Sequence, residues 1–517
     1  MSVDVIQFGN NQPSLDIPGD QSTQQTGSVM RDVYVDLSGN IVKRPVLDLF
    51  CDTGETTAVN GLYDWTNIAD GSVYPNNVMI AIAGGSPFRI REYTASYINE
   101  ITTGTYAAFG TDQKYKVSFA ETGTGSYSTA ALYACNGGKI KRIYLDTGTW
   151  TCADLTDADA PTSVNSIAVF DNYLTAVESG TGNFHWSDVN APTTWSGYYA
   201  NAESNPDRLY SIHQSSSYLF LVGKKTVEVF YNDGVTPFSR LTQGVVPYGS
   251  AAIRGAVYAE AINAFVFRTG DNRIVRTQAT DAVSLSKSLD AFLSYNYSTG
   301  PTDDVGHYFV YEGIPFYLYS SFGGQYGFTT IQAVGGSDTG PTSGFSVIVN
   351  LMNGDWYEWG SYYSTQDRYL PFQAASILNT PAGIFVGDPE DGLIHKMTRS
   401  GVDDTAYGEI KPMIRSVHID RGAPGTEKIC NSLTFSFKAP QTHYGGAFGL
   451  TVKYSDDGGS TWSDGREVVA DISTGQKAKI ITERNWGRYC QRQWMIEFDT
   501  TKDIALGPVV EDFDYVY

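Results

Sequence analysis

The chain has 517 residues, of which 41% are hydrophobic, 13% aromatic and 18% charged, and its formal net charge is −21. This aromatic content excludes a disordered chain, and the lack of Ala-Glu-Lys-Leu-Arg periodicity excludes a helical bundle or coiled coil. The acidic balance argues against binding of nucleic acid or an anionic membrane through Lys and Arg contacts to phosphate. Aromatic residues and 53 glycines favour strands and tight turns, so we predict an all-β protein.

The first predicted part is a short N-terminal segment, residues 1–54. It has a polar stretch and then the strand-like runs DVYVDL and NIVKRPVLDLF. Its start lacks the basic and apolar regions of a signal peptide. No stretch of the chain approaches the roughly 18 uninterrupted apolar residues of a membrane helix, so we expect no membrane anchoring.

Residues 55–405 carry a repeated module, in which an apolar strand, a glycine turn and an alternating strand follow one another. The turn glycines are Gly84, Gly137, Gly180, Gly223, Gly270, Gly313, Gly354 and Gly387. Most intervals are 41–53 residues, close to the roughly 40–45 residues of a four-stranded propeller blade, whereas sandwich hairpins recur at about 8–12 residues. The last interval is only 33 residues, so the last two hairpins are interpreted as one blade. We predict a β-propeller of six or seven blades.

Residues 406–517 contain long alternating runs such as SLTFSFKA, FGLTVKYS and RQWMIEF. Such runs are typical of antiparallel strands with one buried face, so we predict a C-terminal β-sandwich. Both ends of a propeller emerge near one another. We therefore expect the N-terminal segment to pack with the sandwich as one platform.

One motif in this C-terminal part resembles the Asp-box of sialidase-like propellers, S-x-D-x-G-x-T-W. The matching residues are Ser455, Asp457, Gly459, Thr461 and Trp462. In such a hairpin tip the aspartate accepts hydrogen bonds from loop amides, the glycine permits a positive φ, and the tryptophan packs beneath. The copy is single and lies outside the repeats, so we interpret it as a structural hairpin.

Motifs for catalysis are missing from the sequence. It has no G-x-S-x-G, H-E-x-x-H, C-x-x-C or P-loop pattern, and its six histidines are isolated. Acidic pairs occur at Asp303-Asp304, Asp403-Asp404, Asp456-Asp457 and Glu511-Asp512. Their neighbours are turn-forming residues, so turn chemistry is the preferred interpretation over a glycosidase pair. We expect no catalytic residues and no cofactor.

A calcium site has one weak candidate, the loop GDPEDG with Asp388, Glu390 and Asp391. It is shorter than a twelve-residue calcium loop and lacks the distal bidentate glutamate. The five cysteines are scattered, which suits a reducing compartment. Cys135 and Cys152, which flank one strand-turn-strand stretch, are interpreted as two buried thiols.

The stretch from residue 183 to residue 260 resembles the packaged-DNA-stabilisation proteins of short-tailed phages, also called tail hub or nozzle proteins. Their pattern is A-E-S-x-P-D, a strand ending in glycine, and T-[IV]-E-x-[FY]. The matching residues are Ala202, Glu203, Ser204, Pro206, Asp207, Thr226 and Glu228. A weaker echo is Lys43-Arg44-Pro45, after which Val46 stands where the family has glycine.

The resemblance implies a virion structural protein of the phage tail without enzymatic activity, assembled in the cytoplasm of the bacterial host. It implies a homo-hexameric ring below the portal-adaptor ring that extends the DNA channel and helps retain the packaged genome. We expect the platform of the N-terminal segment and the sandwich to face that adaptor. Genomic DNA would pass without sequence-specific binding, and tail fibres, spikes or a needle would attach. The alternative is a carbohydrate-binding or glycan-hydrolysing β-propeller, which would present a cleft rich in arginine or paired carboxylates on one face.

Overall fold

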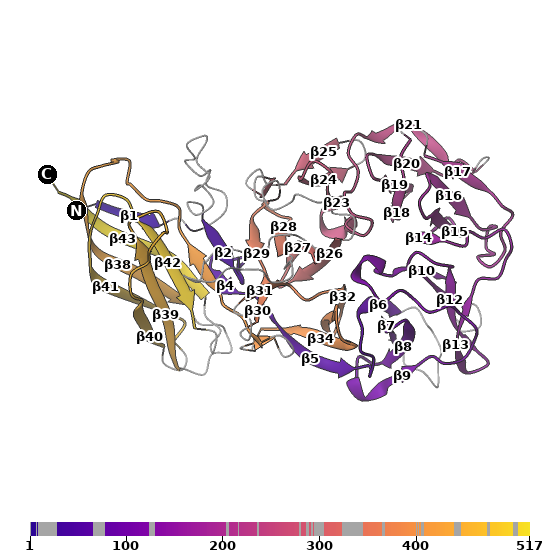
Figure 1. Cartoon of the computed structure of the whole chain (residues 1–517), viewed down its shortest axis with the longest axis horizontal. Coiled ribbons are helices and arrows are strands. Elements are labelled where there is room, and N and C mark those ends of the chain that lie inside the picture. The colour runs from indigo at the N-terminus through magenta and orange to yellow at the C-terminus, as the bar shows by residue number, and fades with distance from the viewer. Residues whose placement is uncertain are drawn as a thin grey trace.

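The computed structural model of the chain consists of a β-propeller and a β-sandwich that lie side by side (Figure 1). The residues that it describes are 2–6, 8, 28–65, 78–123, 130–202, 206–215, 217–234, 237–278, 281–285, 289–290, 293, 304–322, 345–363, 368–399, 401, 403–404, 408–438, 446–472, 476–499 and 505–516. Among them, no helix is long and apolar enough to cross a membrane.

The propeller has seven four-stranded antiparallel blades in the described residues: six separate sheets, and one that forms the start of a nine-stranded sheet. Blade one consists of β6 (Val59–Trp65), β7 (Val78–Ala83), β8 (Ser86–Arg91) and β9 (Ile98–Glu100). Blade two consists of β10 (Ser118–Thr122), β11 (Ala131–Cys135), β12 (Lys141–Asp146) and β13 (Thr149–Asp154). Blade three consists of β14 (Val164–Phe170), β15 (Tyr173–Glu178), β16 (Asn183–Trp186) and β17 (Tyr199–Asn201). Blade four consists of β18 (Leu209–Ser215), β19 (Tyr218–Gly223), β20 (Val227–Tyr231) and β21 (Ser239–Val246). Blade five consists of β22 (Val257–Ala259), β23 (Ala264–Arg268), β24 (Ile274–Gln278) and β25 (Asp281–Ser284). Blade six consists of β26 (Val305–Tyr311), β27 (Ile314–Ser321), β28 (Phe345–Asn350) and β29 (Trp356–Glu358).

The first strand of each blade lies nearest the propeller axis, where β10 contacts β14 and β32 contacts β6 (Figure 1). The second strands are buried almost throughout: all six residues of β7 and all eight of β27 are buried. Because neighbouring blades cover both faces of such a strand, its sequence is a continuous apolar run rather than an alternating one.

The ring closes through a strand from the N-terminal part of the chain. Blade seven combines β32 (Ser376–Thr380), β33 (Gly383–Gly387) and β34 (Leu393–Thr398) with β5 (Val46–Asp52), which runs antiparallel to β34. Because β5 leads directly into blade one, it ties the last blade to the first. The domain limits at residues 54 and 405 stay predictions, but strand pairing assigns β5, inside the predicted N-terminal segment, to the propeller.

The turn glycines change phase along the ring, which makes the one-blade interpretation of the last two hairpins wrong. From Gly84 to Gly270 the glycines lie where a blade's second strand leads to its third. Gly313 instead joins the first two strands of blade six, and Gly354 joins its last two. Gly387 ends the second strand of blade seven. The short final interval therefore separates two blades.

Two sheets form the sandwich. The first contains β3 (Val33–Val35), β4 (Ile41–Lys43), β43 (Ala505–Tyr515), β38 (Lys428–Lys438) and β41 (Ala478–Tyr489), with β1 (Ser2–Ile6) also on β43. The second contains β37 (Met413–Arg415), β42 (Gln493–Phe498), β39 (Gly446–Ser455) and β40 (Arg466–Ile472). Strands from both ends of the chain thus pair directly in this sandwich.

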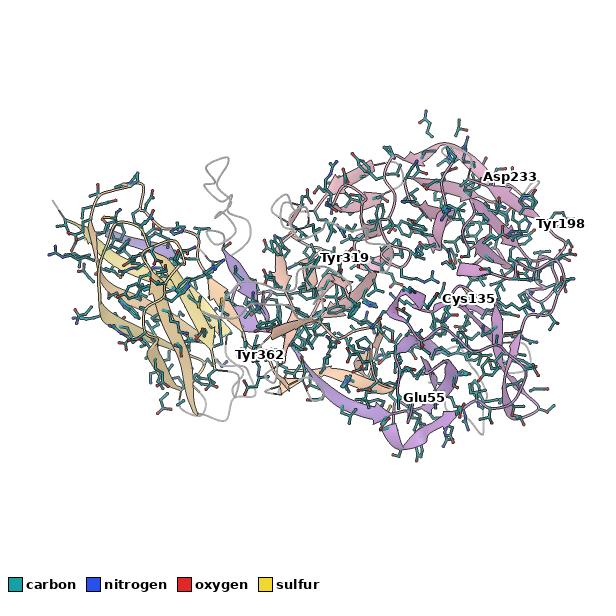
Figure 2. The ribbon with its side chains drawn as sticks, in the orientation of Figure 1. Glu55, Cys135, Tyr198, Asp233, Tyr319 and Tyr362 are labelled. Atoms are coloured by element: carbon teal, nitrogen blue, oxygen red, sulfur yellow. The ribbon has the colours of Figure 1, made fainter. Side chains whose placement is uncertain are left out.

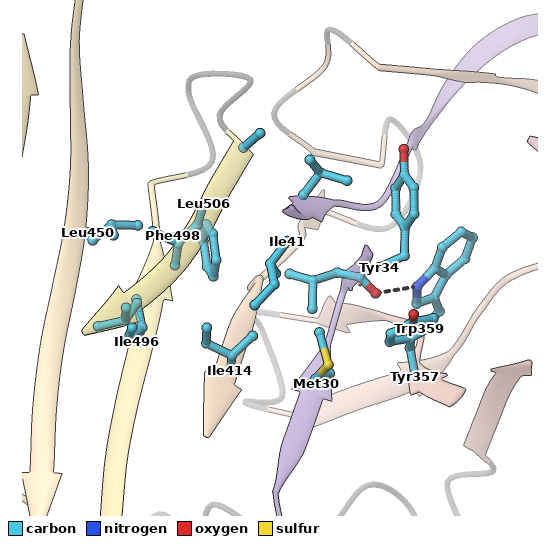
Figure 3. Close-up of a cluster of buried hydrophobic side chains, with 14 of the residues drawn as sticks. Met30, Tyr34, Ile41, Tyr357, Trp359, Ile414, Leu450, Ile496, Phe498 and Leu506 are labelled. Atoms are coloured by element: carbon cyan, nitrogen blue, oxygen red, sulfur yellow. Dashed lines mark hydrogen bonds between the residues drawn. The ribbon is translucent and has the colours of Figure 1, made fainter. Parts of the chain in front are cut away.

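The short strand β2 (Val29–Arg31) joins the two bodies. It pairs in parallel with β29 of blade six and antiparallel with β37 of the sandwich, so one nine-stranded sheet runs from β26 to β40. One apolar cluster also extends across the junction, from Trp359 through Tyr34 and Ile41 to Ile496 and Leu506 (Figure 3). In it the Trp359 indole N–H donates to the carbonyl of Val33 at 3.1 Å. The propeller and sandwich therefore share a hydrophobic core.

The remaining described elements are short. They are the 3-10 helices η2 (Ala95–Tyr97), η3 (Gln113–Tyr115) and η4 (Glu260–Ile262), and the two-stranded pairs β30 (Gly360–Tyr363) with β31 (Arg368–Pro371) and β35 (Asp403–Asp404) with β36 (Gly408–Glu409).

Candidate functional site

The Lys43-Arg44-Pro45 motif lies at the junction of the propeller and the sandwich. Arg44 is fully buried between two carboxylates, with Nε 2.8 Å from Asp32 Oδ1 and Nη2 2.7 Å from Asp404 Oδ2. It also donates to the carbonyls of Pro45 and Gly360. Burial lowers the pKa of Arg44, but the charges of Asp404 and Asp32 outweigh it, and the net shift is upward. Arg44 therefore remains charged and holds three segments together.

The chain around Arg44 is fixed by backbone bonds as well. Asp32 has a φ of 53°. Its N–H donates to the carbonyl of Glu358, and its own carbonyl accepts from the N–H of Arg44. The guanidinium of Arg31, the residue before it, pairs with Glu358 at 3.1 Å. The ammonium of Lys43 donates to the carbonyl of Gly401 at 2.7 Å. The motif thus fixes the chain at the junction of the propeller and the sandwich, and these contacts do not form a binding cleft.

The second family-like segment organises the turn between β19 and β20. The carboxylate of Asp207 accepts from the N–H groups of Lys225 and Thr226, at 2.5 and 3.0 Å. A Cβ at Gly223 would lie 2.5 Å from Asp207 Oδ2, so glycine is needed for this close approach. The spacing of Asp207, Gly223 and Thr226 is therefore explained by one capped turn.

The other members of this segment lie around the same blade. Ala202 is buried in the cluster between blades three and four, whereas Pro206 is exposed. Glu228 is buried and lies 3.5 Å from the guanidinium of Arg240. Glu203 and Ser204 lie outside the described residues.

The predicted acidic pairs also contribute carboxylates to ion pairs with arginines. In each pair one carboxylate meets an arginine far away in the sequence. The ion pairs are Asp304 with Arg268, Asp404 with Arg44, Asp456 with Arg492 and Glu511 with Arg421. Arg44 was noted in the sequence only as part of its motif, and Arg268, Arg421 and Arg492 were not singled out, because partners separated by tens to hundreds of residues leave no local pattern.

The candidate calcium loop does not bring its three carboxylates together as a set of ligands. Asp388 is fully buried, and its Oδ1 accepts from the N–H groups of Glu390 and Asp391 at 2.8 and 2.9 Å. Its Oδ2 lies 3.2 Å from His395 Nε2. In the described part of the chain, no group of three or more His, Cys, Asp or Glu side chains is arranged to hold a metal. Asp388 is thus occupied as a turn cap.

The Asp-box lies at the tip of the β39–β40 hairpin. Asp457 accepts from the hydroxyls of Thr461 and Ser455 and from the N–H of Thr461, at 2.5, 2.7 and 2.9 Å. The Thr461 hydroxyl bond, followed by the other bonds, lowers the pKa of Asp457 to about 2. Gly459 has a positive φ of 85°, and Trp462 is half-buried. The bonds are local and stabilise the tip.

A shallow cavity of about 440 Å³ lies beside β26 and the β32–β33 hairpin. Its lining includes Tyr308, Tyr311, Asn379 and Met397, and among the described lining residues Glu260 is the single carboxylate. A glycosidase site needs two carboxylates on facing walls, so this lining does not supply that arrangement.

The cysteines are free thiols in the described structure. Cys135 and Cys152 are fully buried in blade two, and burial raises the pKa of each to about 12. They remain protonated and pack as small apolar groups.

A family model described as "Phage_stabilise: Bacteriophage P22 Gp10, beta-propeller" matches residues 101–286. This range spans blades two to five, from β10 to β25, and contains the capped turn at Asp207. No curated protein matches the chain.

Among solved structures, the extracellular domain of the one component system BT4673 from B. thetaiotaomicron is 8% identical, with a TM-score of 0.39; the match covers 87% of this chain and 62% of that one. The chain thus spans less than two thirds of that protein's length. The structure "YCF48 bound to D1 peptide" is 8% identical, with a TM-score of 0.37 and coverages of 69% and 98%. Hsv2 of Kluyvelomyces marxianus is 9% identical, with a TM-score of 0.26 and coverages of 46% and 59%. None of these likenesses carries an argument about function.

The family match and the blade architecture agree over the same part of the chain. The matched family model describes a phage stabilisation protein. Residues 101–286 are therefore similar, in family model and in blade architecture, to the β-propeller described for bacteriophage P22 Gp10.

Proposed function

We propose that this chain is a structural protein of the virion tail, which forms a homo-hexameric hub or nozzle ring below the portal-adaptor ring. The ring extends the DNA channel and helps to retain the packaged genome. The observation that carries this proposal is the family match over blades two to five. In this role the chain works by geometry and ring closure, without catalysis, and is assembled in the host cytoplasm.

The junction of the two bodies supports the proposal. The shared core and the continuous nine-stranded sheet favour one rigid subunit, and a ring that retains packaged DNA needs rigid subunits. The net charge of −21 disfavours adhesion to DNA phosphates, so an acidic channel wall would let genomic DNA pass without sequence-specific binding.

Exposed apolar side chains supply surfaces for ring contacts and for fibres, spikes or a needle. Tyr198, Tyr199 and Tyr218 are exposed on blades three and four, and Tyr198 lies at the propeller rim opposite the sandwich (Figure 2). On the sandwich, Val469 and Ile480 are exposed on β40 and β41. Aromatic and apolar surface residues of this kind are enriched at protein interfaces.

Mass photometry of the purified chain, alone and mixed with candidate portal-adaptor rings, tests this function. We expect a species of six times 56.5 kDa on the adaptor, and six-fold averages by negative-stain microscopy. Tyr199→Glu tests the propeller rim, with Glu483→Gln on the sandwich surface as a control that leaves the rim unchanged.

If the chain stays monomeric, binds none of the adaptor rings and binds on a glycan array, the tail proposal is overturned and the carbohydrate-binding propeller is favoured. If the Tyr199→Glu variant also forms the ring, the proposal of a ring stands, but the propeller rim is not one of its contact surfaces.

A further inference from the structure

Four basic side chains converge on the axis of the propeller. Lys116 lies two residues before the inner strand of blade two, and Arg254 lies three residues before that of blade five. His213 and His307 lie on the inner strands of blades four and six. Inner strands of different blades face one another across the axis, so these residues, remote in sequence, become neighbours.

The Lys116 side chain crosses this axis. Its ammonium donates to the carbonyl of Gly306 at 2.7 Å, although blades two and six are not adjacent in the ring. The N–H of Gly306 donates to the carbonyl of Arg254 at 2.9 Å. A Cβ at Gly306 would lie 2.2 Å from the carbonyl of Gly255, so glycine permits this close approach. The Lys116 ammonium and the backbone of Arg254 therefore both contact Gly306.

The charges at this point repel one another. Burial, and then the charge of Arg254, lower the pKa of Lys116 to about 7. Burial, Lys116 and Arg254 lower the pKa of His213 to about 4, and burial and Lys116 lower that of His307 well below its usual value. Within the described residues, neither Lys116 nor Arg254 is paired with a carboxylate.

One buried donor of the Arg254 side chain has no hydrogen-bond partner in the described structure. Arg254 is only 8% exposed, yet its Nε has no hydrogen-bond partner in the described structure. Burying an unpaired charged donor is costly. Arg44, Arg421 and Arg492, in contrast, each have a carboxylate partner. Lys116 and Arg254 thus place basic groups, without a carboxylate partner among the described residues, on the axis of a chain whose net charge is −21.

We propose that Lys116 and Arg254 bind a small inorganic oxyanion of the phosphate and sulfate class on the propeller axis. A guanidinium presents parallel N–H donors that match the oxygens of such an anion, and the ammonium adds a second charge. The anion satisfies the Arg254 donors and removes the repulsion between the two cations. It links blades two, five and six across the ring, and this does not depend on the tail role.

Titration of the full chain with sodium phosphate tests the site. The protein is first exchanged into chloride buffer, and ionic strength is held constant with sodium chloride. We expect a saturable heat in calorimetry and a rise in the unfolding temperature that chloride alone does not produce. A parallel titration with sodium sulfate distinguishes a general oxyanion site from one selective for phosphate.

Lys116→Met and Arg254→Met are each expected to weaken phosphate binding by about tenfold or more, since each removes one charged contact. Lys224→Met removes the same charge from an exposed turn of blade four and should leave the affinity unchanged. If Arg254→Met does not fold, the wild-type titration and Lys116→Met still decide the question. An absent or unsaturable phosphate response in the wild type, or equal loss in Lys224→Met, would overturn the proposal.

Discussion

At the residue scale, buried arginines and their carboxylates fix how segments of this chain are arranged relative to one another. Arg44 lies between Asp32 and Asp404, and Arg492 meets Asp456 with two contacts of 2.7 and 2.8 Å. Such pairs contribute little net free energy relative to apolar packing, but they fix one arrangement because each unpaired partner would be costly. The strands that they join therefore have a defined register and orientation.

Arg44→Met should be among the most destabilising single changes in the junction. It leaves Asp32 and Asp404 buried without their cation, and loss of one partner of a buried pair costs about 3–5 kcal/mol. The midpoint of urea unfolding, followed by tryptophan fluorescence, measures the loss. Arg399→Met, which removes a partly exposed partner of Glu312, is the matched control and should change the midpoint much less. Equal effects of the two variants would contradict the structural role of Arg44.

At the scale of elements, β5 closes the propeller. One of its two leucines is buried and the other is exposed, so the effect of burial can be compared on a single strand. Leu47 is fully buried and pairs with Met397 of β34, whereas Leu49 is 47% exposed. We expect Leu47→Ala to lower the free energy of unfolding by about 2–5 kcal/mol and Leu49→Ala to have a small effect. Urea unfolding of both variants measures this difference.

Limited proteolysis of the same two variants tests the closure itself. Because β5 ties blade seven to blade one, Leu47→Ala should speed cleavage in both blades together. Faster cleavage confined to residues 46–52 would show that the strand is a local attachment and not the closure of the ring.

The sequence predicted the elements where local pattern determines them. Apolar runs with regular turn glycines indicated the blades, and S-x-D-x-G-x-T-W indicated the hairpin tip at Asp457. It did not reveal the partner of β5, because this pairing joins residues more than 300 positions apart. The glycine count failed at Gly313, where the glycine moved to a different turn of its blade. The axis cluster was missed because Lys116, Arg254 and the two histidines carry no common spacing.

For the whole molecule, the junction makes the propeller and the sandwich depend on each other. β2 pairs with both bodies, and Trp359, fully buried in blade six, donates to Val33 in the first sheet of the sandwich. A shared core of this kind couples the unfolding of its two sides, since neither side can open without exposing the other's apolar surface. We therefore expect one cooperative unfolding transition for the full chain.

Trp359→Ala should uncouple the two bodies. It removes the indole that packs against Tyr34, Phe309 and Phe372, and deletion of a buried tryptophan costs about 3–5 kcal/mol. Because the loss falls at the junction, calorimetry should resolve two transitions, and hydrogen exchange should rise first in β2 and β37. Trp150→Ala in blade two, remote from the junction, should lower the stability while keeping one transition. Two transitions already in the wild type, or one in Trp359→Ala, would mean that the shared core does not transmit stability between the bodies.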